Sequence, residues 1–232
     1  MVDLKELWHS YLDAEVARTT EATGQQAEVW RIAGRPSKEK PDGENLDWWR
    51  ADGLDQLQGY ERWLNKTDLR FVSYDGTPAI ELPFVIELAG ITVRGFIDAV
   101  MVNPDGEVIV IDHKTGSRTP DSLLQLGLYA TAMEVMGYPR PSLGSFWMTR
   151  KGSMTQPESL DRYSIDFYTQ SFTLFDAAVA NDIFIPNIGS HCRGCSVRTY
   201  CYATGGALAY RSDPLHPQYQ KQDGTTTTKE TT

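Results

Sequence analysis

The sequence of 232 residues predicts a mixed α/β domain in which a mixed sheet is flanked by helices. Two apolar, β-branched runs at 91–102 and 107–111 surround Asn103-Pro104-Asp105-Gly106, a strong turn signal, and so predict a hairpin of buried strands. From Ile80 to Leu88 every second residue is large and apolar, which is typical of a strand with one buried face. Segments with helical periodicity lie on both sides of these strands, as a layered α/β fold requires.

Helical periodicity predicts the elements before and after the strands. Apolar residues at helical spacing predict an amphipathic helix over 4–16, followed by a polar loop or frayed helix at 19–26. After a turn-rich loop at 34–43, a second helix spans 46–64. We interpret its aromatic residues as core rather than as base-stacking groups; they are Trp48, Trp49, Tyr60 and Trp63. A third helix over 121–136 carries Gln125 and Tyr129 four residues apart, hence on one face.

The C-terminal third predicts a second strand pair and a last helix. A strand is expected at 143–149, with a turn at 150–152 and a pairing strand at 160–165. We interpret Arg150 and Lys151 in that turn as solvated rather than as phosphate-binding. A helix is expected at 166–181. Residues 205–232 are rich in Gly, Pro, Gln and Thr, and we expect a disordered tail there.

Composition excludes some classes of protein. The net charge of −9 argues against a protein that coats nucleic acid, although residues 140–211 hold 7 basic residues against 5 acids and would supply any DNA groove. No apolar run is long enough to span a membrane, and the N-terminus lacks the pattern of a secretion signal. We therefore expect a cytoplasmic protein with no membrane partner.

The hairpin brings together a chemically specific set. Asp112 and Lys114 alternate along one strand and so share a face, and antiparallel pairing can bring Asp98 beside Asp112. Two carboxylates this close repel each other unless a cation lies between them, and hard oxygen ligands suit Mg²⁺ or Mn²⁺. The alternative is an ordinary surface ion pair at a strand end.

The three cysteines, Cys192, Cys195 and Cys201, lie within ten residues. A disulfide framework would use an even, dispersed set, so the spacing favours a metal site in a reducing compartment. Either Zn²⁺ or a [4Fe–4S] cluster would need a fourth ligand. His9 and His191 are candidates, although we favour a plain surface or packed role for His9.

Three motifs in combination resemble the RecB-like nucleases of the PD-(D/E)xK superfamily, which include CRISPR adaptation exonucleases and phage-encoded relatives. The motifs are Gly95-x-x-Asp98, Asp112-x-Lys114-Thr115-Gly116 and Gln125-x-x-x-Tyr129, and the resemblance covers about residues 79–201. It implies a restriction-endonuclease-like fold with a nuclease domain over 1–204, in a bacterial or phage-infected cell. Within it we expect a helical N-terminal part at 1–75, a catalytic core at 79–150 and the cysteine cluster at 186–204.

The resemblance also implies roles for single residues. Asp98, Asp112 and the main-chain carbonyl of His113 would bind Mg²⁺ or Mn²⁺, and Lys114 would orient the attacking water. Glu81 matches the acid of a Glu-x-Pro-Phe element beside the metal, with a solvent-facing strand glutamate as an equal alternative. Gln125 and Tyr129 would position the DNA strand or surround the lysine.

The sequence departs from the family pattern at its N-terminal end. The family's iron–sulfur members carry an upstream cysteine, and the family carries a histidine in a Gly-x-x-x-His helix; this sequence has neither. We expect that an N-terminal segment is missing, with natural loss as the alternative. In both cases the iron–sulfur cluster would be incomplete.

The expected function is a divalent-metal-dependent DNA nuclease, an exonuclease on single strands or duplex ends, acting in repair, recombination or phage DNA processing with a possible helicase or recombination partner. Two alternatives remain: a non-catalytic DNA-binding or scaffold protein that retains the fold, and a small zinc-stabilised interaction module. Cleavage polarity, exonuclease or endonuclease preference, pathway and oligomeric state stay open.

Overall fold

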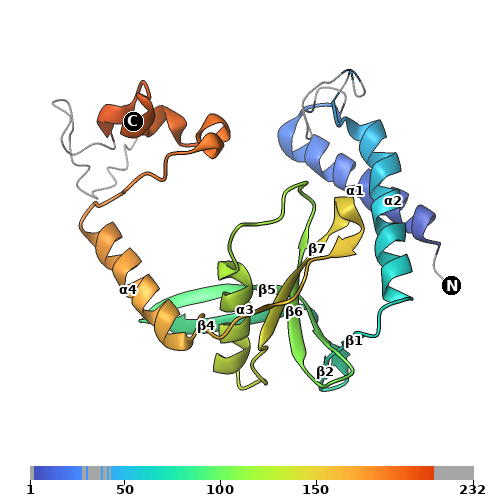
Figure 1. Cartoon of the computed structure of the whole chain (residues 1–232). Coiled ribbons are helices and arrows are strands. Elements are labelled where there is room, and N and C mark those ends of the chain that lie inside the picture. The colour runs from blue at the N-terminus through green and yellow to red at the C-terminus, as the bar shows by residue number, and fades with distance from the viewer. Residues whose placement is uncertain (1–2, 28–29, 31–37, 39–40, 42, 212–232) are drawn as a thin grey trace, which may run out of the picture. The chain divides into compact units, whose positions relative to one another are not determined.

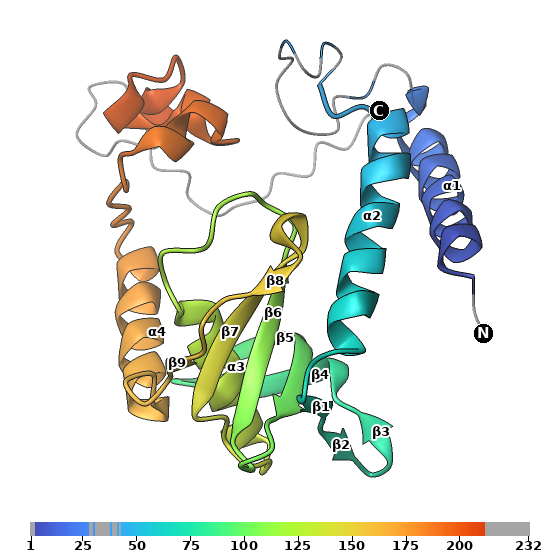
Figure 2. The ribbon, with the colours of Figure 1, turned by 45° about the vertical axis from the view of Figure 1, so that its right-hand side comes forward.

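The computed structural model describes residues 3–27, 30, 38, 41 and 43–211. These residues form two compact units, whose border lies between Thr173 and Leu174. The first unit contains the helices and the sheet predicted from the sequence, and Figures 1 and 2 show its strands with helices packed beside them. The mixed α/β prediction is confirmed for this unit.

The chain begins with helix α1, Leu4–Thr23. The Asp3 carboxylate accepts hydrogen bonds from the main-chain N–H groups of Lys5 and Glu6 and so caps its first turn. The helix ends at Gly24, whose φ of 67° is the left-handed conformation that glycine adopts without strain. Of the two alternatives for 19–26, a polar loop or a frayed helix, the structure shows helix as far as Thr23, because these polar residues continue an exposed helix until a residue able to end it.

Helix α2 spans Leu46–Leu64. Asn45 caps its N-terminus, because the Asn45 side chain accepts a hydrogen bond from the Trp48 N–H. It lies beside α1 in both views (Figures 1 and 2). The close approach depends on Gly53, because a Cβ atom there would lie 2.3 Å from the ring of Trp8. A sequence with any larger residue at this position would push the two helices apart.

One mixed sheet forms the centre of the first unit. Its strands are β1 (Arg70–Phe71), β4 (Ile80–Leu88), β5 (Ile91–Val102), β6 (Val108–Lys114), β7 (Leu143–Met148), β8 (Ser153–Met154) and β9 (Glu158–Ser159). The order is β1-β5-β6-β7-β8, with β4 also on β5 and β9 also on β7. Only β6 and β7 pair in parallel, and a separate hairpin joins β2 (Ser73–Tyr74) to β3 (Thr77–Pro78).

The predicted β5–β6 hairpin is confirmed, with Ala99 opposite Ile111 and Val102 opposite Val108. The predicted strand at 160–165 is wrong. The strands after the turn that pair with β7 are β8 and β9, each two residues long, and Leu160 and Tyr163 beyond β9 are buried in the core. Their apolar side chains fill the space beneath α3, so burial, not strand pairing, explains the apolar pattern.

Helices cover the sheet from two sides. Helix α3, Leu124–Val135, packs its buried residues against one apolar cluster that includes Ile97, Val110 and Phe146. Tyr60 and Trp63 of α2 pack against a second cluster that includes Ile111 and Trp147. Because alternate residues of β6 enter different clusters, the strand is buried on both faces, and its polar residues lie only at its end.

Helix α4, Ile165–Ala180, crosses the border between the units, close to its predicted span. The second unit continues with short 3₁₀ turns: η3 (Ser190–Gly194), η4 (Arg198–Tyr200), η5 (Tyr202–Thr204) and η6 (Ala209–Arg211). The predicted tail at 205–232 thus begins with a turn, and residues 212–232 lie outside the described residues. Within the described ranges, no helix is long and apolar enough to cross a membrane.

Candidate active site

Neighbouring positions on β4, β5 and β6 bring three acidic residues to one level of the sheet. Ala99 pairs with Ile111, so continuing the register by one residue places Asp98 across from Asp112. On the other side of β5, the pairs Ile80–Ala99 and Leu82–Ile97 leave Glu81 across from Asp98. Residues directly opposite each other in antiparallel strands project to the same side, which explains how acids 14 or more residues apart can meet.

Asp112, Lys114, Gln125 and Tyr129 form a closed ring of contacts between β6 and α3, which we call the Lys114 ring. Asp112 Oδ2 lies 2.7 Å from Lys114 Nζ, and Lys114 Nζ donates a hydrogen bond of 2.8 Å to Gln125 Oε1. Gln125 Nε2 donates to the Tyr129 hydroxyl at 2.7 Å, and that hydroxyl lies 3.5 Å from Asp112 Oδ1. The four-residue spacing puts Gln125 and Tyr129 on one face of α3, and the alternation along β6 puts Asp112 and Lys114 on the face of the strand that meets them.

Asp98 is held separately, against the strand that carries Asp112. Its Oδ2 atom accepts a hydrogen bond of 2.7 Å from the main-chain N–H of His113 and lies 3.6 Å from His113 Nδ1. The Asp98 side chain is 22% exposed, whereas that of Asp112 is 2% exposed. The two carboxylates therefore lie in different dielectric surroundings.

As a result, the pKa values of the two aspartates are shifted in opposite directions. Burial raises the pKa of Asp112 above its usual range, and the ion pair with Lys114 only partly offsets this effect. Burial would also raise the pKa of Asp98, but the hydrogen bonds from His113 outweigh it and lower that pKa. Burial raises the pKa of Tyr129 to about 12, so its hydroxyl stays a donor at neutral pH.

Glu81 lies apart from these side chains. It has a φ of 49°, in the left-handed region, and is exposed. Its carboxylate has no hydrogen bond or ion pair among the contacts of the described residues. The register puts its Cα near Asp98, but the kink of β4 leaves the side chain in solvent.

The donor set around Asp98 and Asp112 suits a hard divalent cation. Asp112 Oδ2 is buried and accepts no hydrogen bond of good geometry, since its contact with Lys114 is an ion pair alone. With Asp98 and the His113 carbonyl it offers oxygen ligands of the kind that Mg²⁺ and Mn²⁺ prefer. The described part of the chain contains no set of three or more His, Cys, Asp or Glu side chains in metal-binding proximity, so this site would depend on two carboxylates.

Comparison with known proteins identifies the family. The sequence profile of the PD-(D/E)XK nuclease superfamily matches residues 4–202. The chain belongs to this superfamily. The gene 69 protein of Mycobacterium phage D29 is 34% identical over 194 residues, which cover 74% of this chain and 71% of the relative. The gene 69 protein of Mycobacterium phage L5 is 40% identical over 131 residues, or 53% of this chain and 44% of that protein, so the match spans less than half of its length.

One solved structure, that of SSO0001, resembles the chain weakly. Its TM-score is 0.35 at 12% sequence identity, and the match covers 67% of this chain and 70% of the other. A likeness at this level carries no conclusion about function.

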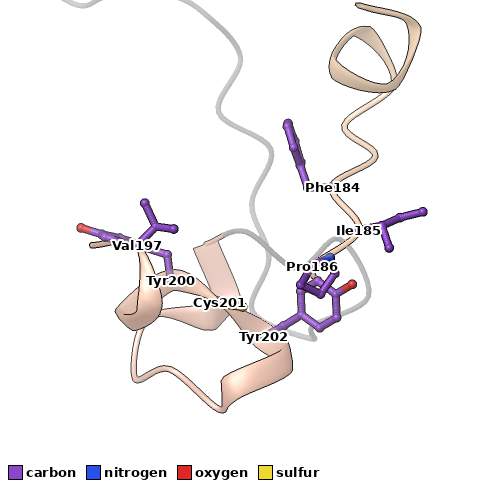
Figure 3. Close-up of a pocket in the computed structure, with 7 residues that line it drawn as sticks. All are labelled: Phe184, Ile185, Pro186, Val197, Tyr200, Cys201 and Tyr202. Atoms are coloured by element: carbon purple, nitrogen blue, oxygen red, sulfur yellow. The ribbon is translucent and has the colours of Figure 1, made fainter. Parts of the chain in front are cut away.

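The predicted cysteine metal site has no support in the superfamily match or in the structure. Cys192, Cys195 and Cys201 are free, and they are not among any three metal-ligating side chains close together in the described residues. Cys201 instead lines an apolar pocket with Tyr200 and Tyr202 (Figure 3). The main-chain N–H of Gly189 donates to Cys192 Sγ at 3.4 Å. Of the candidate fourth ligands, His191 contacts the Asn187 carbonyl at 2.7 Å, and His9 lies on α1.

Sequence reasoning missed a pair that braces the loop after Lys114. Arg150 donates two hydrogen bonds, of 2.8 and 2.7 Å, to the Glu44 carboxylate, and a third, of 2.7 Å, to the Thr115 carbonyl. Its guanidinium also lies over the rings of Trp48 and Trp49. The solvated turn expected at Arg150 is therefore wrong. No local pattern pointed to this pair, because Glu44 and Arg150 are 106 positions apart.

Proposed function

We propose that this protein is a divalent-metal-dependent deoxyribonuclease, an exonuclease that hydrolyses phosphodiester bonds at single strands or duplex ends. Membership of a nuclease superfamily supports the reaction class, and relatives from mycobacteriophages favour phage DNA processing, recombination or repair as the setting. The observation that carries the proposal is the Lys114 ring at the C-terminal end of β6, beside Asp98 of β5.

Asp98, Asp112 and the main-chain carbonyl of His113 are the residues that would hold Mg²⁺ or Mn²⁺. The bound cation would acidify a water molecule and neutralise charge on the phosphate. Ionised Asp112 is disfavoured by its burial, so a cation placed beside it would relieve this cost. The lowered pKa of Asp98 keeps that carboxylate ionised and ready to bind.

Lys114 has the position of an electrostatic catalyst. An ammonium has three donors, one of which Lys114 gives to Gln125, while Asp112 Oδ2 is its ion-pair partner. A donor that Gln125 does not engage would orient the attacking water or stabilise the negative charge that develops on the phosphate. Gln125 and Tyr129 fix the direction of the ammonium, since each is bonded to the next member of the ring. Glu81, exposed at the edge of the site, is expected to act only indirectly.

The main alternative is a DNA-binding or scaffold protein that keeps the fold without catalysis. The intact contacts of Lys114 weigh against it, because a binding protein has no use for a buried carboxylate paired with a lysine. A helicase or recombination partner fits either function. DNA is the substrate or ligand in both.

End-labelled single- and double-stranded DNA, incubated with Mn²⁺ or with chelator, tests the proposal directly. Lys114→Met and Asp112→Asn should each lower the cleavage rate at least about a hundredfold, the usual loss when a transition-state donor is removed. Lys66→Met and Asp105→Asn are matched controls, because both residues are exposed and neither belongs to the ring; Asp105 lies in the turn before β6, at the opposite end of the strand from Asp112. Cleavage by Lys114→Met at the parent rate, or cleavage in chelator, would disprove the assignment.

A further inference from the structure

A cavity of about 320 Å³ lies on the other side of β6 from the Lys114 ring. His113, between Asp112 and Lys114 in sequence, projects to the opposite face of the strand and contributes to its wall. The rest of the wall comes from α1, α2, β7 and the two threonines Thr115 and Thr149. Its aromatic members besides His113 are Trp8, Trp49, Tyr60 and Trp147. The volume is in the range of about 300–1,000 Å³ typical of small-molecule sites.

The wall is aromatic and carries unused hydrogen-bonding groups. Trp49 Nε1, His113 Nε2 and Trp147 Nε1 are buried and have no hydrogen-bond partner among the described residues. Trp147 is fully buried, and an indole N–H can only donate. A buried donor without an acceptor is costly, so its retention calls for an explanation. A ligand with flat faces, acceptor atoms for the two indole N–H groups and a donor for His113 Nε2 would satisfy all three groups, because Nε2 accepts when Nδ1–H faces Asp98.

The absence of charged side chains from the described residues of the cavity wall narrows the class of ligand further. In the described part of the chain, no lysine, arginine, aspartate or glutamate lines this cavity. A phosphate group would find no counter-charge in it, which excludes the DNA backbone as the occupant. A nucleobase, in contrast, stacks on indole and phenol rings whatever its sequence identity, and its carbonyl oxygens and ring nitrogens accept hydrogen bonds.

The cavity is adjacent to the site proposed for the reaction. His113 Nδ1 lies 3.6 Å from Asp98 Oδ2, while Nε2 of the same ring is the unpartnered nitrogen of the cavity wall. Thr115, directly after Lys114, also lines the cavity. A nucleotide with its base in the cavity would therefore hold a neighbouring phosphate close to Asp98 and Lys114.

We infer that this cavity takes one unpaired base of a single-stranded DNA end and so positions the scissile phosphate. The inference rests on the proposed nuclease function and names the form of its substrate. It changes the interpretation of the α2 aromatic residues: Trp63 packs in the core as expected, whereas Trp49 becomes a base-contacting residue.

Binding in chelator separates this inference from catalysis, because the whole protein can be tested without cleaving the probe. A short single-stranded oligothymidylate should quench the tryptophan fluorescence of the protein. Trp49→Phe and Trp147→Phe remove a donor but keep an aromatic ring, and each should weaken binding about 3- to 10-fold. Trp63→Phe is the matched control, since Trp63 neighbours Trp147 without lining the cavity, and it should leave affinity unchanged.

Two further probes identify the part of the DNA that is bound. An abasic oligonucleotide of the same length should bind Trp49→Phe and the parent protein equally, because only the backbone remains. A blunt duplex should bind more weakly than the single strand, since pairing occupies the base edges. Two results would overturn the base site, whatever the nuclease assay shows. Trp49→Phe could lose as much affinity for the abasic probe as for the oligothymidylate, or its affinity for the oligothymidylate could equal that of the parent protein. The affinity of Trp147→Phe is compared with that of the parent protein only if the two have the same Tm, because Trp147 is also part of the core.

Discussion

At the scale of single residues, Asp98 and Asp112 show how two like groups take different roles. They lie across from each other on β5 and β6, yet hydrogen bonds lower the pKa of one and burial raises the pKa of the other. Separated pKa values are a frequent property of reactive sites. The sequence predicted that the two acids would approach each other, but not which of them would be buried, because burial depends on the packing of α3.

Because their pKa values are shifted in opposite directions, Asp112 and Asp98 make the stability of the folded protein depend on pH in opposite ways. The folded pKa of Asp112 is raised, so its favourable contribution is complete below the unfolded pKa of about 3.9 and is lost as pH rises through the folded pKa. Asp98 has a lowered pKa, so its contribution is present above about pH 3.9 and is lost as pH falls through the folded pKa. At neutral pH in chelator, Asp112→Asn should raise Tm and Asp98→Asn should lower it, each by about 2–4 °C, the effect of about 1 kcal/mol in a domain of this size.

Thermal unfolding with and without Mn²⁺ checks this pair of variants. Mn²⁺ at about a hundred times its Kd should stabilise the parent protein by about 2.7 kcal/mol, and neither variant should gain as much. Near pH 3 the advantage of Asp112→Asn should vanish, because the parent carboxyl is then protonated. A lower Tm for Asp112→Asn at neutral pH would mean that the ion pair with Lys114 outweighs the cost of burial.

At the scale of elements, the spacing of apolar residues along the sequence predicted a helix or strand correctly where that spacing alone determines the element. The hairpin, the alternating strand at 80–88 and the helices around Gln125 and in 166–181 were all predicted from periodicity. The misses have a common cause: apolar residues at 160–165 are buried without strand pairing, and Arg150 is braced by a residue far away in sequence. Contacts between distant segments leave no periodic signal, so a single sequence could not predict them.

The packing of α1 on α2 yields a matched pair of glycine variants. Gly53→Ala would place Cβ 2.3 Å from the Trp8 ring, so the ring must move, and overpacking of this kind costs about 1–3 kcal/mol. Gly59→Ala, six residues later in the same helix, meets only the end of the Arg62 side chain at 3.8 Å and should stabilise α2 by about 0.5–1 kcal/mol. Urea unfolding of both variants measures the difference. Equal stabilisation by the two alanines would show that Trp8 does not rest on Gly53.

At the scale of the whole molecule, the proposed chemistry belongs to one of the two units. Asp98, the Lys114 ring and the cavity all come from residues before Thr173, whereas the three cysteines lie after it. The sequence placed the cysteines at a metal because their spacing allowed one. Spacing shows only that ligands can meet; whether they do depends on how the turns between them fold, and here Cys201 faces apolar neighbours.

This division leads to a prediction for the cysteines. A variant with Cys192→Ser, Cys195→Ser and Cys201→Ser changes residues of the second unit alone, whereas Asp98 and the Lys114 ring belong to the first unit. Because the proposed chemistry is assigned to the first unit, the rate of DNA cleavage by this variant should stay within about twofold of the parent rate. Steady-state cleavage of end-labelled DNA measures the rate, and Lys114→Met in the same assay marks the level of a lost site. A loss of activity in the serine variant comparable to that of Lys114→Met would mean that the second unit contributes to catalysis, because serine replaces each thiol with little change in volume and removes mainly its capacity to bind metal or to react.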